Sequence, residues 1–223
     1  MSKKELKSLN KFYNENSDFL EIGIDEAGRG PLFGRVYTGA VILPKDVNFE
    51  FDKMKDSKKF SSIKKINEVA DYIKENALAW NVSYNDETVI DNINIRQSVL
   101  NSMHNSIKNI ISDNNDYLLL VDGNDFKPYM RFKENDNEYL PVNHKCIEGG
   151  DNKYCAIAAA SILAKTERDK YINELCEENP ELIDRYGIDK NKGYGTKKHL
   201  DGIKNYGITK WHRKTYGICK DYC

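Results

Sequence analysis

Carboxylates stand at the ends of apolar segments, where they could bind a cation. Asp25 and Glu26 directly follow a short apolar run, Asp122 follows a second, and Asp151 lies where a helical pattern begins. A buried carboxylate is costly unless it is paired or bound to a cation. Hard divalent cations take oxygen ligands, and two of them roughly 4 Å apart can activate a water and stabilise a leaving oxygen in phosphodiester cleavage. A metal-dependent site is therefore one hypothesis for these acids.

Each acid also has a structural interpretation. Asp122 and Gly123 form a common turn pair, and Asp151 could be the N-cap of the following helix. The adjacent pair Asp25 and Glu26 is harder to explain, because packing gains nothing from it. Adjacent strand residues face opposite sides, so both could reach one site only if the strand ends or bulges at Glu26.

Asp169 lies eighteen residues after Asp151. On a continuous helix the two would share a face but lie about 27 Å apart. Asp169 could not share an ion with Asp151, so we expect it in a structural salt bridge or in a supporting role.

The elements that position these residues follow from periodicity and turn signals. Apolar and β-branched runs predict strands over 19–25, 36–43, 77–84 and 117–121. Helical spacing predicts helices over 62–74, 94–111, 156–175, 181–186 and 197–206. Strands interleaved with helices, beginning with a hairpin, indicate a mixed α/β layer. We expect an N-terminal extension or short helix over 1–17, a mixed α/β domain over 18–188 and a basic helical segment over 189–223.

The composition excludes several classes of protein. The mean hydropathy is -0.70, and no apolar run is long enough for a membrane span. Five cysteines without a C-x-x-C pair do not indicate a disulfide framework or a zinc site. The N-terminus lacks the apolar region of a secretory signal. We therefore expect an intracellular, cytoplasmic protein that does not act at a membrane.

The net charge of -1 hides a segregation along the chain. Residues 113–151 hold nine acids and four bases, 52–65 hold six lysines and two acids, and 189–223 hold nine bases and three acids. The total charge is uninformative, but basic flanks around an acidic middle agree with phosphates held beside cation-binding carboxylates.

The stretch from Gly23 to Pro31, GIDEAGRGP, resembles the signature of the type 2 ribonucleases H, the ribonuclease HII family. Further segments match the family in order and extend the resemblance from about residue 22 to 215. They are DSKKFS at 56–61, VDG at 121–123, GD at 150–151, AAASILAK at 158–165, RD at 168–169, GYGT at 193–196, HL at 199–200 and HRK at 212–214.

This resemblance implies a ribonuclease H-like fold, with a mixed five-stranded sheet, flanking helices and a small helical C-terminal segment. Residues 18–188 would then be the catalytic domain, and 189–223 would bind the substrate. It implies an endonuclease that hydrolyses the RNA strand of RNA/DNA hybrids and cuts duplex DNA on the 5′ side of an embedded ribonucleotide, leaving 3′-hydroxyl and 5′-phosphate ends. The implied cofactors are two Mg²⁺ or Mn²⁺ ions, with Asp25, Glu26, Asp122 and Asp151 as metal-binding catalytic residues. Asp25 would bridge both ions.

The resemblance also implies substrate-binding residues. Gly28, Arg29 and Gly30 correspond to the turn that recognises the ribose 2′-hydroxyl and the neighbouring phosphate, and Tyr194 to a tyrosine that stacks beside the ribonucleotide. Without the resemblance, a half-buried core tyrosine would be the default interpretation.

Lys58 and Lys59 are candidates for phosphate contacts, although most lysines of this segment would ordinarily be solvated. His199 and His212 lie in matched segments, where a structural role is the commoner one. Phe33 and Arg35 depart from the family pattern and would place a bulky ring and a charge beside the site.

We expect a monomer whose partners are RNA/DNA hybrids and ribonucleotide-containing duplex DNA. One alternative is another ribonuclease H-like nuclease that acts on DNA alone. A second alternative, from a different class, is a non-catalytic hybrid-binding protein that keeps the fold.

Overall fold

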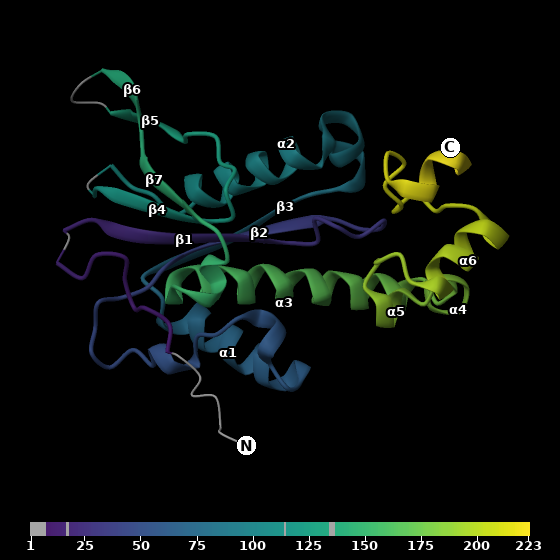
Figure 1. The fold of residues 1–223 in the computed structure, drawn as a ribbon, viewed down its shortest axis with the longest axis horizontal. Coiled ribbons are helices and arrows are strands. Elements are labelled where there is room, and N and C mark those ends of the chain that lie inside the picture. The colour runs from purple at the N-terminus through teal and green to yellow at the C-terminus, as the bar shows by residue number, and fades with distance from the viewer. Residues whose placement is uncertain (1–7, 17, 114, 134–136) are drawn as a thin grey trace.

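The computed structural model describes residues 8–16, 18–113, 115–133 and 137–223. A mixed five-stranded sheet with strand order β3-β2-β1-β4-β7 forms its centre (Figure 1). β1 pairs antiparallel with β2 and β2 antiparallel with β3, whereas β1 and β4, and β4 and β7, are parallel. The strands are β1 (Leu20–Ala27), β2 (Val36–Ile42), β3 (Ala79–Asn85), β4 (Tyr117–Asp122) and β7 (Asn143–Ile147). The predicted fold class is confirmed.

Helices cover both faces of this sheet (Figure 1). α1 (Ile63–Asn76) and α3 (Cys155–Glu178) share one apolar core with β2, while α2 (Glu87–Lys108) packs against β1, β2 and β4 on the other face. The start of α3 lies directly against β1, where a Cβ on Gly23 would come 2.0 Å from the Ala156 carbonyl carbon. The glycine therefore permits the close approach that fixes α3 beneath the first strand.

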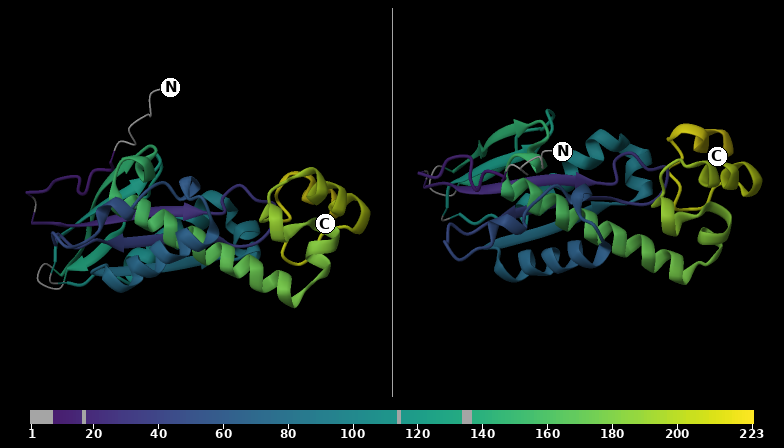
Figure 2. Two further views of the ribbon diagram at one scale, coloured as in Figure 1. Left: turned by 90° about the horizontal axis from the view of Figure 1, so that it is seen from below. Right: turned by 60° about the horizontal axis from the view of Figure 1, so that its bottom comes forward.

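The remaining helices surround the far end of α3 (Figures 1 and 2). They are α4 (Glu181–Tyr186), α5 (Ile188–Asn191), α6 (Lys197–Tyr206) and the 3-10 helix η4 (Gly217–Tyr222). α4 and α6 have the predicted bounds. Phe33, from the link between β1 and β2, is fully buried among the side chains of this helical group. This link therefore joins the sheet to the C-terminal helices.

Three strands were not predicted, all within the acidic middle of the chain. β5 (Met130–Lys133) and β6 (Glu138–Pro141) form a separate hairpin, and β7 is an edge strand of the main sheet. β7 is an edge strand whose residues are mostly polar and largely exposed. It therefore lacks the apolar run that identifies a central strand in the sequence. The expectation of helix over 94–111 also missed the first part of α2, which begins at Glu87 and contains the non-helical Asn94.

The described part of the predicted N-terminal extension packs against the body of the protein. Asn10 donates its N–H to the Lys153 carbonyl at 2.8 Å and accepts from the Cys155 N–H at 2.9 Å. The ring of Phe12 contacts Phe51 edge-on at 5.5 Å. Residues 8–16 therefore form no helix and stay mostly exposed while contacting the body at these points, and 1–7 and 17 lie outside the described residues. Within the described ranges, no helix has both the length and the apolar character to cross a membrane.

Candidate active site

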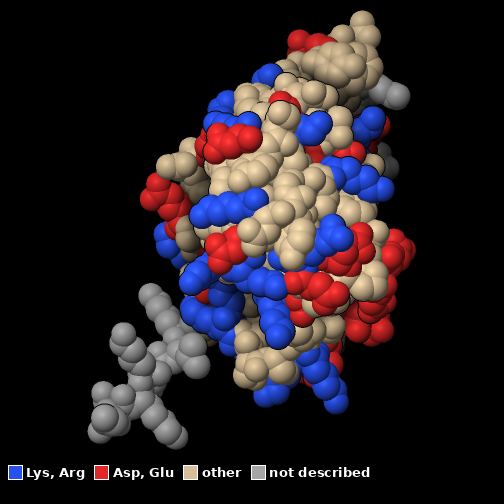
Figure 3. All heavy atoms as spheres, turned by 90° about the vertical axis from the view of Figure 1, so that its right-hand side faces the viewer, with Lys and Arg blue, Asp and Glu red and all other residues tan. Residues whose placement is uncertain are grey.

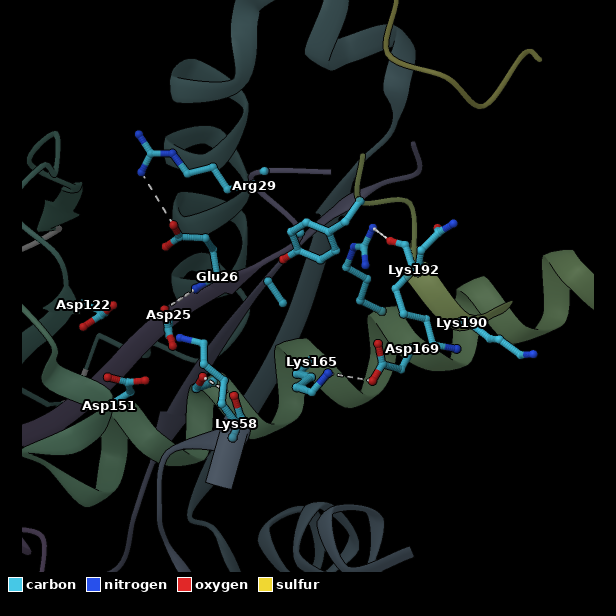
Figure 4. A pocket seen from close by; sticks show the side chains of 18 residues that line it. Asp25, Glu26, Arg29, Lys58, Asp122, Asp151, Lys165, Asp169, Lys190 and Lys192 are labelled. Carbon is cyan, nitrogen blue, oxygen red and sulfur yellow. Dashed lines mark hydrogen bonds and ion pairs between the residues drawn. The ribbon is translucent and has the colours of Figure 1, made fainter. Parts of the chain in front are cut away.

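A cavity of about 510 Å³ opens at the carboxyl ends of β1 and β4 (Figure 4). Its lining comes from β1, the turn after it, β4, α3 and the α5 region. Ten of the predicted site residues line it: Asp25, Glu26, Gly28, Arg29, Gly30, Lys58, Asp122, Asp151, Asp169 and Tyr194. The carboxylates of Asp25, Asp122 and Asp151 lie together at one end in Figure 4, with Lys190 and Lys192 at the other. Lys59 and His199 do not line it.

Asp25 and Glu26 both reach the cavity without a bulge. β1 stays paired with β2 as far as Ala27, so the expected break at Glu26 is absent. Pairing with β4, however, ends at Ile24, opposite Val121. Beyond that register the strand has a neighbour on one side only, which leaves room for both adjacent side chains.

Burial makes these two carboxylates costly to ionise. Asp25 is 5% exposed, and burial raises its pKa well above the usual value, with repulsion from Glu26 and Asp122 adding to the effect. Its Oδ1 accepts a hydrogen bond from the Glu26 N–H at 2.7 Å. Burial also raises the pKa of Glu26, opposed by the Arg29 guanidinium, which lies 3.6 Å from the Glu26 carboxylate.

Asp122 and Asp151 come together because β4 and β7 are parallel neighbours. Asp122 pairs with Ile147 in the register, and η3 (Gly150–Asn152) follows β7 closely. The Asp122 Oδ1 accepts a hydrogen bond from the Gly150 N–H at 2.6 Å. Burial raises the pKa of Asp122, and repulsion from Asp151 acts in the same direction.

The structural interpretations of these two acids differ in outcome. Asp122 is the last residue of β4, and the chain bends after it at Gly123, which has φ of 90° and still donates its N–H to the Ile147 carbonyl of β7 at 3.1 Å. Asp151 is not the N-cap of α3, because that position belongs to Tyr154. Asp151 is 6% exposed and accepts a hydrogen bond from the Asn152 side chain at 3.0 Å.

The donor set fits a hard divalent cation. Four carboxylates line one cavity, and burial and mutual repulsion oppose ionisation of Asp25, Glu26 and Asp122, a cost that a bound cation would remove. In the part of the chain that the structure describes, no three His, Cys, Asp or Glu side chains are close enough to enclose an ion unaided. Waters or substrate oxygens would have to complete the coordination, as is usual for Mg²⁺.

Positive side chains form the other part of the cavity (Figure 4). Lys165 and Arg168, from α3, and Lys190 and Lys192, from the α5 region, line it together with Lys58. Lys and Arg also gather on the lower part of the molecular face in Figure 3. These four residues were not predicted, although Lys165 and Arg168 lie in matched segments and Lys190 and Lys192 in the basic C-terminal segment.

Asp169 lies in a salt bridge, one of the two roles expected for it. It forms an ion pair with Lys165 at 2.9 Å, and it also lines the cavity. Lys59 instead hydrogen-bonds to the Asn152 side chain, and its Nζ lies 3.8 Å from the Asp56 carboxylate.

His199 is fully buried beneath Tyr194. Its Nδ1 hydrogen-bonds to the Tyr194 carbonyl at 3.0 Å, and its Nε2 to the His212 Nε2 at 3.0 Å. This geometry supports the structural interpretation of both histidines. Tyr194 itself is 52% exposed, so the default interpretation as a half-buried core residue does not apply.

Neither departure from the family pattern reaches the cavity. The Phe33 ring packs edge-on against His212 at 5.1 Å within the C-terminal helical group. The Arg35 guanidinium lies between Tyr84 and Tyr171, at 4.2 and 4.3 Å from their ring centroids. The expectation that they crowd the site is wrong, because the chain after Pro31 runs away from the cavity.

Comparison with known proteins gives a consistent result. The model of the family described as Ribonuclease HII matches residues 22–218. The ribonuclease HII of Bacteroides thetaiotaomicron is 42% identical over 206 residues, which cover 92% of this chain and 94% of that protein.

Two solved structures show the same fold. The ribonuclease H2 from Pyrococcus horikoshii has a TM-score of 0.71 at 19% identity and covers 91% of this chain and 96% of its own. The RNase HII of the PCNA:RNase HII complex from Archaeoglobus fulgidus has a TM-score of 0.69 at 23% identity. The match covers 89% of this chain and 96% of that chain. The matched family model and the relative together establish that the chain belongs to the ribonuclease HII family, the type 2 ribonucleases H.

Proposed function

We propose that this type 2 ribonuclease H, besides hydrolysing the RNA strand of RNA/DNA hybrids, cuts duplex DNA on the 5′ side of an embedded ribonucleotide. The products would carry 3′-hydroxyl and 5′-phosphate ends. One observation carries this proposal: the four carboxylates, the Gly28–Arg29–Gly30 turn and Tyr194 line a single cavity. A group that can recognise one ribose therefore lies beside groups that can bring cations to its phosphate.

The turn and Tyr194 are suited to recognise one ribonucleotide. A Cβ on Gly30 would lie 3.6 Å from the Tyr194 ring, so the ring faces the turn at close range. Glycines let backbone groups approach a sugar closely, and the half-exposed ring offers a stacking surface. A 2′-hydroxyl is the group that distinguishes RNA from DNA at a single position.

We propose that Asp25, Glu26, Asp122 and Asp151 hold two divalent ions, Mg²⁺ or Mn²⁺. Such ions supply activation of water and stabilisation of charge on the leaving oxygen. Backbone groups orient two of the carboxylates: the Gly150 N–H donates to Asp122, and the Glu26 N–H donates to Asp25. No protein side chain is needed as a nucleophile.

The cationic part of the cavity would hold the phosphates on either side of the cut. Lys58, Lys165 and Lys190 are positioned to contact the duplex backbone, which would make binding depend strongly on salt. Every group named here comes from one chain, so we also propose that the protein acts as a monomer.

Three duplexes test this proposal in Mg²⁺: one with a single ribonucleotide, an RNA/DNA hybrid, and an all-DNA duplex. We expect cleavage of the first two, with the first cut only on the 5′ side of the ribonucleotide. Cleavage of the all-DNA duplex would instead identify a DNA nuclease. Tight binding of the first two duplexes without turnover in Mg²⁺ or Mn²⁺ would identify a non-catalytic binding protein.

A further inference from the structure

Arg213 lies beneath the substrate turn and is fully buried. Its guanidinium donates four hydrogen bonds, all to backbone carbonyls of the link between β1 and β2. The acceptors are Gly28 at 2.6 Å, Pro31 at 2.8 Å, Gly34 at 2.9 Å and Arg29 at 3.0 Å. One side chain from the C-terminal segment therefore holds the turn along its whole length.

These bonds fix the direction of the peptide groups. In a trans peptide the C=O and the following N–H point in opposite directions, and the described chain has no cis peptide bond. With the carbonyls of Gly28 and Arg29 held inward, the N–H groups of Arg29 and Gly30 point away from Arg213. Neither N–H has a hydrogen-bond acceptor among the described residues. Both are therefore available to an oxygen of the substrate.

A second buried arginine supports the same region. Arg168 is 3% exposed and donates to the carbonyls of Phe33 and Arg35, both at 3.2 Å, and of Lys192 at 2.9 Å. Neither Arg168 nor Arg213 forms a salt bridge within the described ranges. Burial lowers the pKa of Arg213 to about 10, so it stays charged at neutral pH. The two positive charges beneath the turn also favour an anion above it.

The residue before Arg213 supports Tyr194. The Thr209 N–H donates to His212 Nδ1 at 2.9 Å, so in the neutral ring the proton lies on Nε2 and is donated to His199 Nε2. The remaining proton of His199 is then on Nδ1 and is donated to the Tyr194 carbonyl. The adjacent residues His212 and Arg213 thus support Tyr194 and the Gly28–Gly30 turn, respectively.

We propose that Arg213 is a positioning residue for ribonucleotide recognition, which turns the Arg29 and Gly30 N–H groups toward the ribose and phosphate of the substrate. This inference rests on the proposed function, because it needs a ribonucleotide at the turn. The Tyr216 hydroxyl assists by donating to the Arg29 carbonyl at 2.9 Å.

The test measures binding in an Asp25→Asn background, so that cleavage does not interfere. The Kd in Mg²⁺ is measured for a duplex with one ribonucleotide and for the same duplex without it. The ratio of the two dissociation constants reports recognition of the ribose. We expect Arg213→Lys to lower this ratio about tenfold while binding of the all-DNA duplex changes less than twofold. Lysine keeps the charge but cannot reproduce the four-bond geometry.

Matched variants separate positioning from general damage. Arg131, 9% exposed, also donates to two backbone carbonyls, of Ser112 and Asn115, but lies away from the cavity, so Arg131→Lys should keep the parental ratio. If Arg213→Lys does not fold, Tyr216→Phe should lower the ratio about threefold. Tyr186→Phe, which removes a hydroxyl that donates to Gly207, should leave it unchanged.

Two results would overturn the inference. One is a folded Arg213→Lys or Tyr216→Phe variant with the parental ratio. The other is an equal loss of affinity for both duplexes, which indicates general destabilisation. A parent without any preference for the ribonucleotide would instead refute the proposed function, and the inference would fall with it.

Discussion

Alanine substitution at three glycines tests the structure of the substrate turn. Gly28 has φ of 90°, and a Cβ there would come 2.2 Å from the Arg168 Nε. Gly123 also has φ of 90°, but a Cβ there would meet nothing within 4 Å. At Gly30 the nearest atom to a Cβ would be Cε1 of Tyr194, at an ordinary contact distance of 3.6 Å. Alanine would therefore meet backbone strain and a steric clash at Gly28, backbone strain alone at Gly123, and neither at Gly30.

The expected changes in the free energy of unfolding follow from these contacts. Gly123→Ala should lower the free energy of unfolding by about 1–2 kcal/mol, because a non-glycine residue is strained at positive φ. Gly28→Ala adds the displacement of Arg168, and losing one or two charge-assisted hydrogen bonds brings the total to about 3–6 kcal/mol. Gly30→Ala should change stability by less than about 0.5 kcal/mol. Its methyl group would nevertheless narrow the gap between the turn and the Tyr194 ring.

Urea unfolding measures the three stabilities, and cleavage of the single-ribonucleotide duplex measures activity. We expect Gly30→Ala to lose about tenfold in kcat/KM with wild-type stability, since the methyl group lies where the substrate must approach. Gly123→Ala serves as the control for backbone strain. Two results would contradict these expectations: a Gly28→Ala variant no less stable than Gly123→Ala, or a Gly30→Ala variant that cleaves as fast as the wild type.

Three further predictions concern charge. The pKa of Asp25 is raised in the folded state, so the ionised form of Asp25 opposes folding. Without divalent ions, Asp25→Asn should therefore increase the free energy of unfolding at pH 7. This gain should shrink as the pH falls toward 3.8. A loss of stability at pH 7 in urea unfolding with EDTA would contradict this. Burial lowers the pKa of His212 from 6.5 to about 3. The stability of the wild type relative to His212→Asn should therefore be greatest above pH 7 and should decrease as the pH falls from 6.5 toward 3. A stability difference independent of pH would contradict this prediction. Lys58 lines the cavity and Lys59 does not, so Lys58→Ala should raise KM several-fold and reduce the salt dependence of binding by about one phosphate contact. Lys59→Ala should change neither quantity. Equal effects of the two variants would contradict a specific role for Lys58.

The position of the four acids could be predicted from sequence because strand ends and local motifs fix it. Asp122 ends β4, and Asp25 directly follows Ile24, the last residue of β1 that pairs with β4, so the parallel pairing of the two strands brings both acids to one sheet edge. For Asp151 the sequence left two interpretations, because an N-cap has the same sequence signal. The unpredicted strand β7 decides its place, since it brings residue 147 beside Asp122.

The support of the site could not be predicted, because it depends on contacts between distant segments. Arg213 lies 185 positions from Gly28 along the chain, and its matched segment gave no sign of what it binds. Phe33 and Arg35 were expected beside the site because they follow the turn in sequence, yet the chain direction carries both away from it. The break at Asn94 likewise depends on packing: it has φ of 64°, and its side chain accepts a hydrogen bond from the Gln97 N–H at 3.1 Å.

The clustered carboxylates are proposed to bring about the cut by holding the divalent ions. The most direct measurement is the single-turnover rate of cleavage, in Mg²⁺, of a duplex with one ribonucleotide by the wild type, Asp25→Asn and Asp122→Asn. Asp116→Asn, an exposed acid outside the cavity, is the control. We predict wild-type cutting on the 5′ side, an unchanged rate for the control, and rates at least about a hundredfold lower for the two cavity variants. Cleavage by either cavity variant at the wild-type rate would contradict the account.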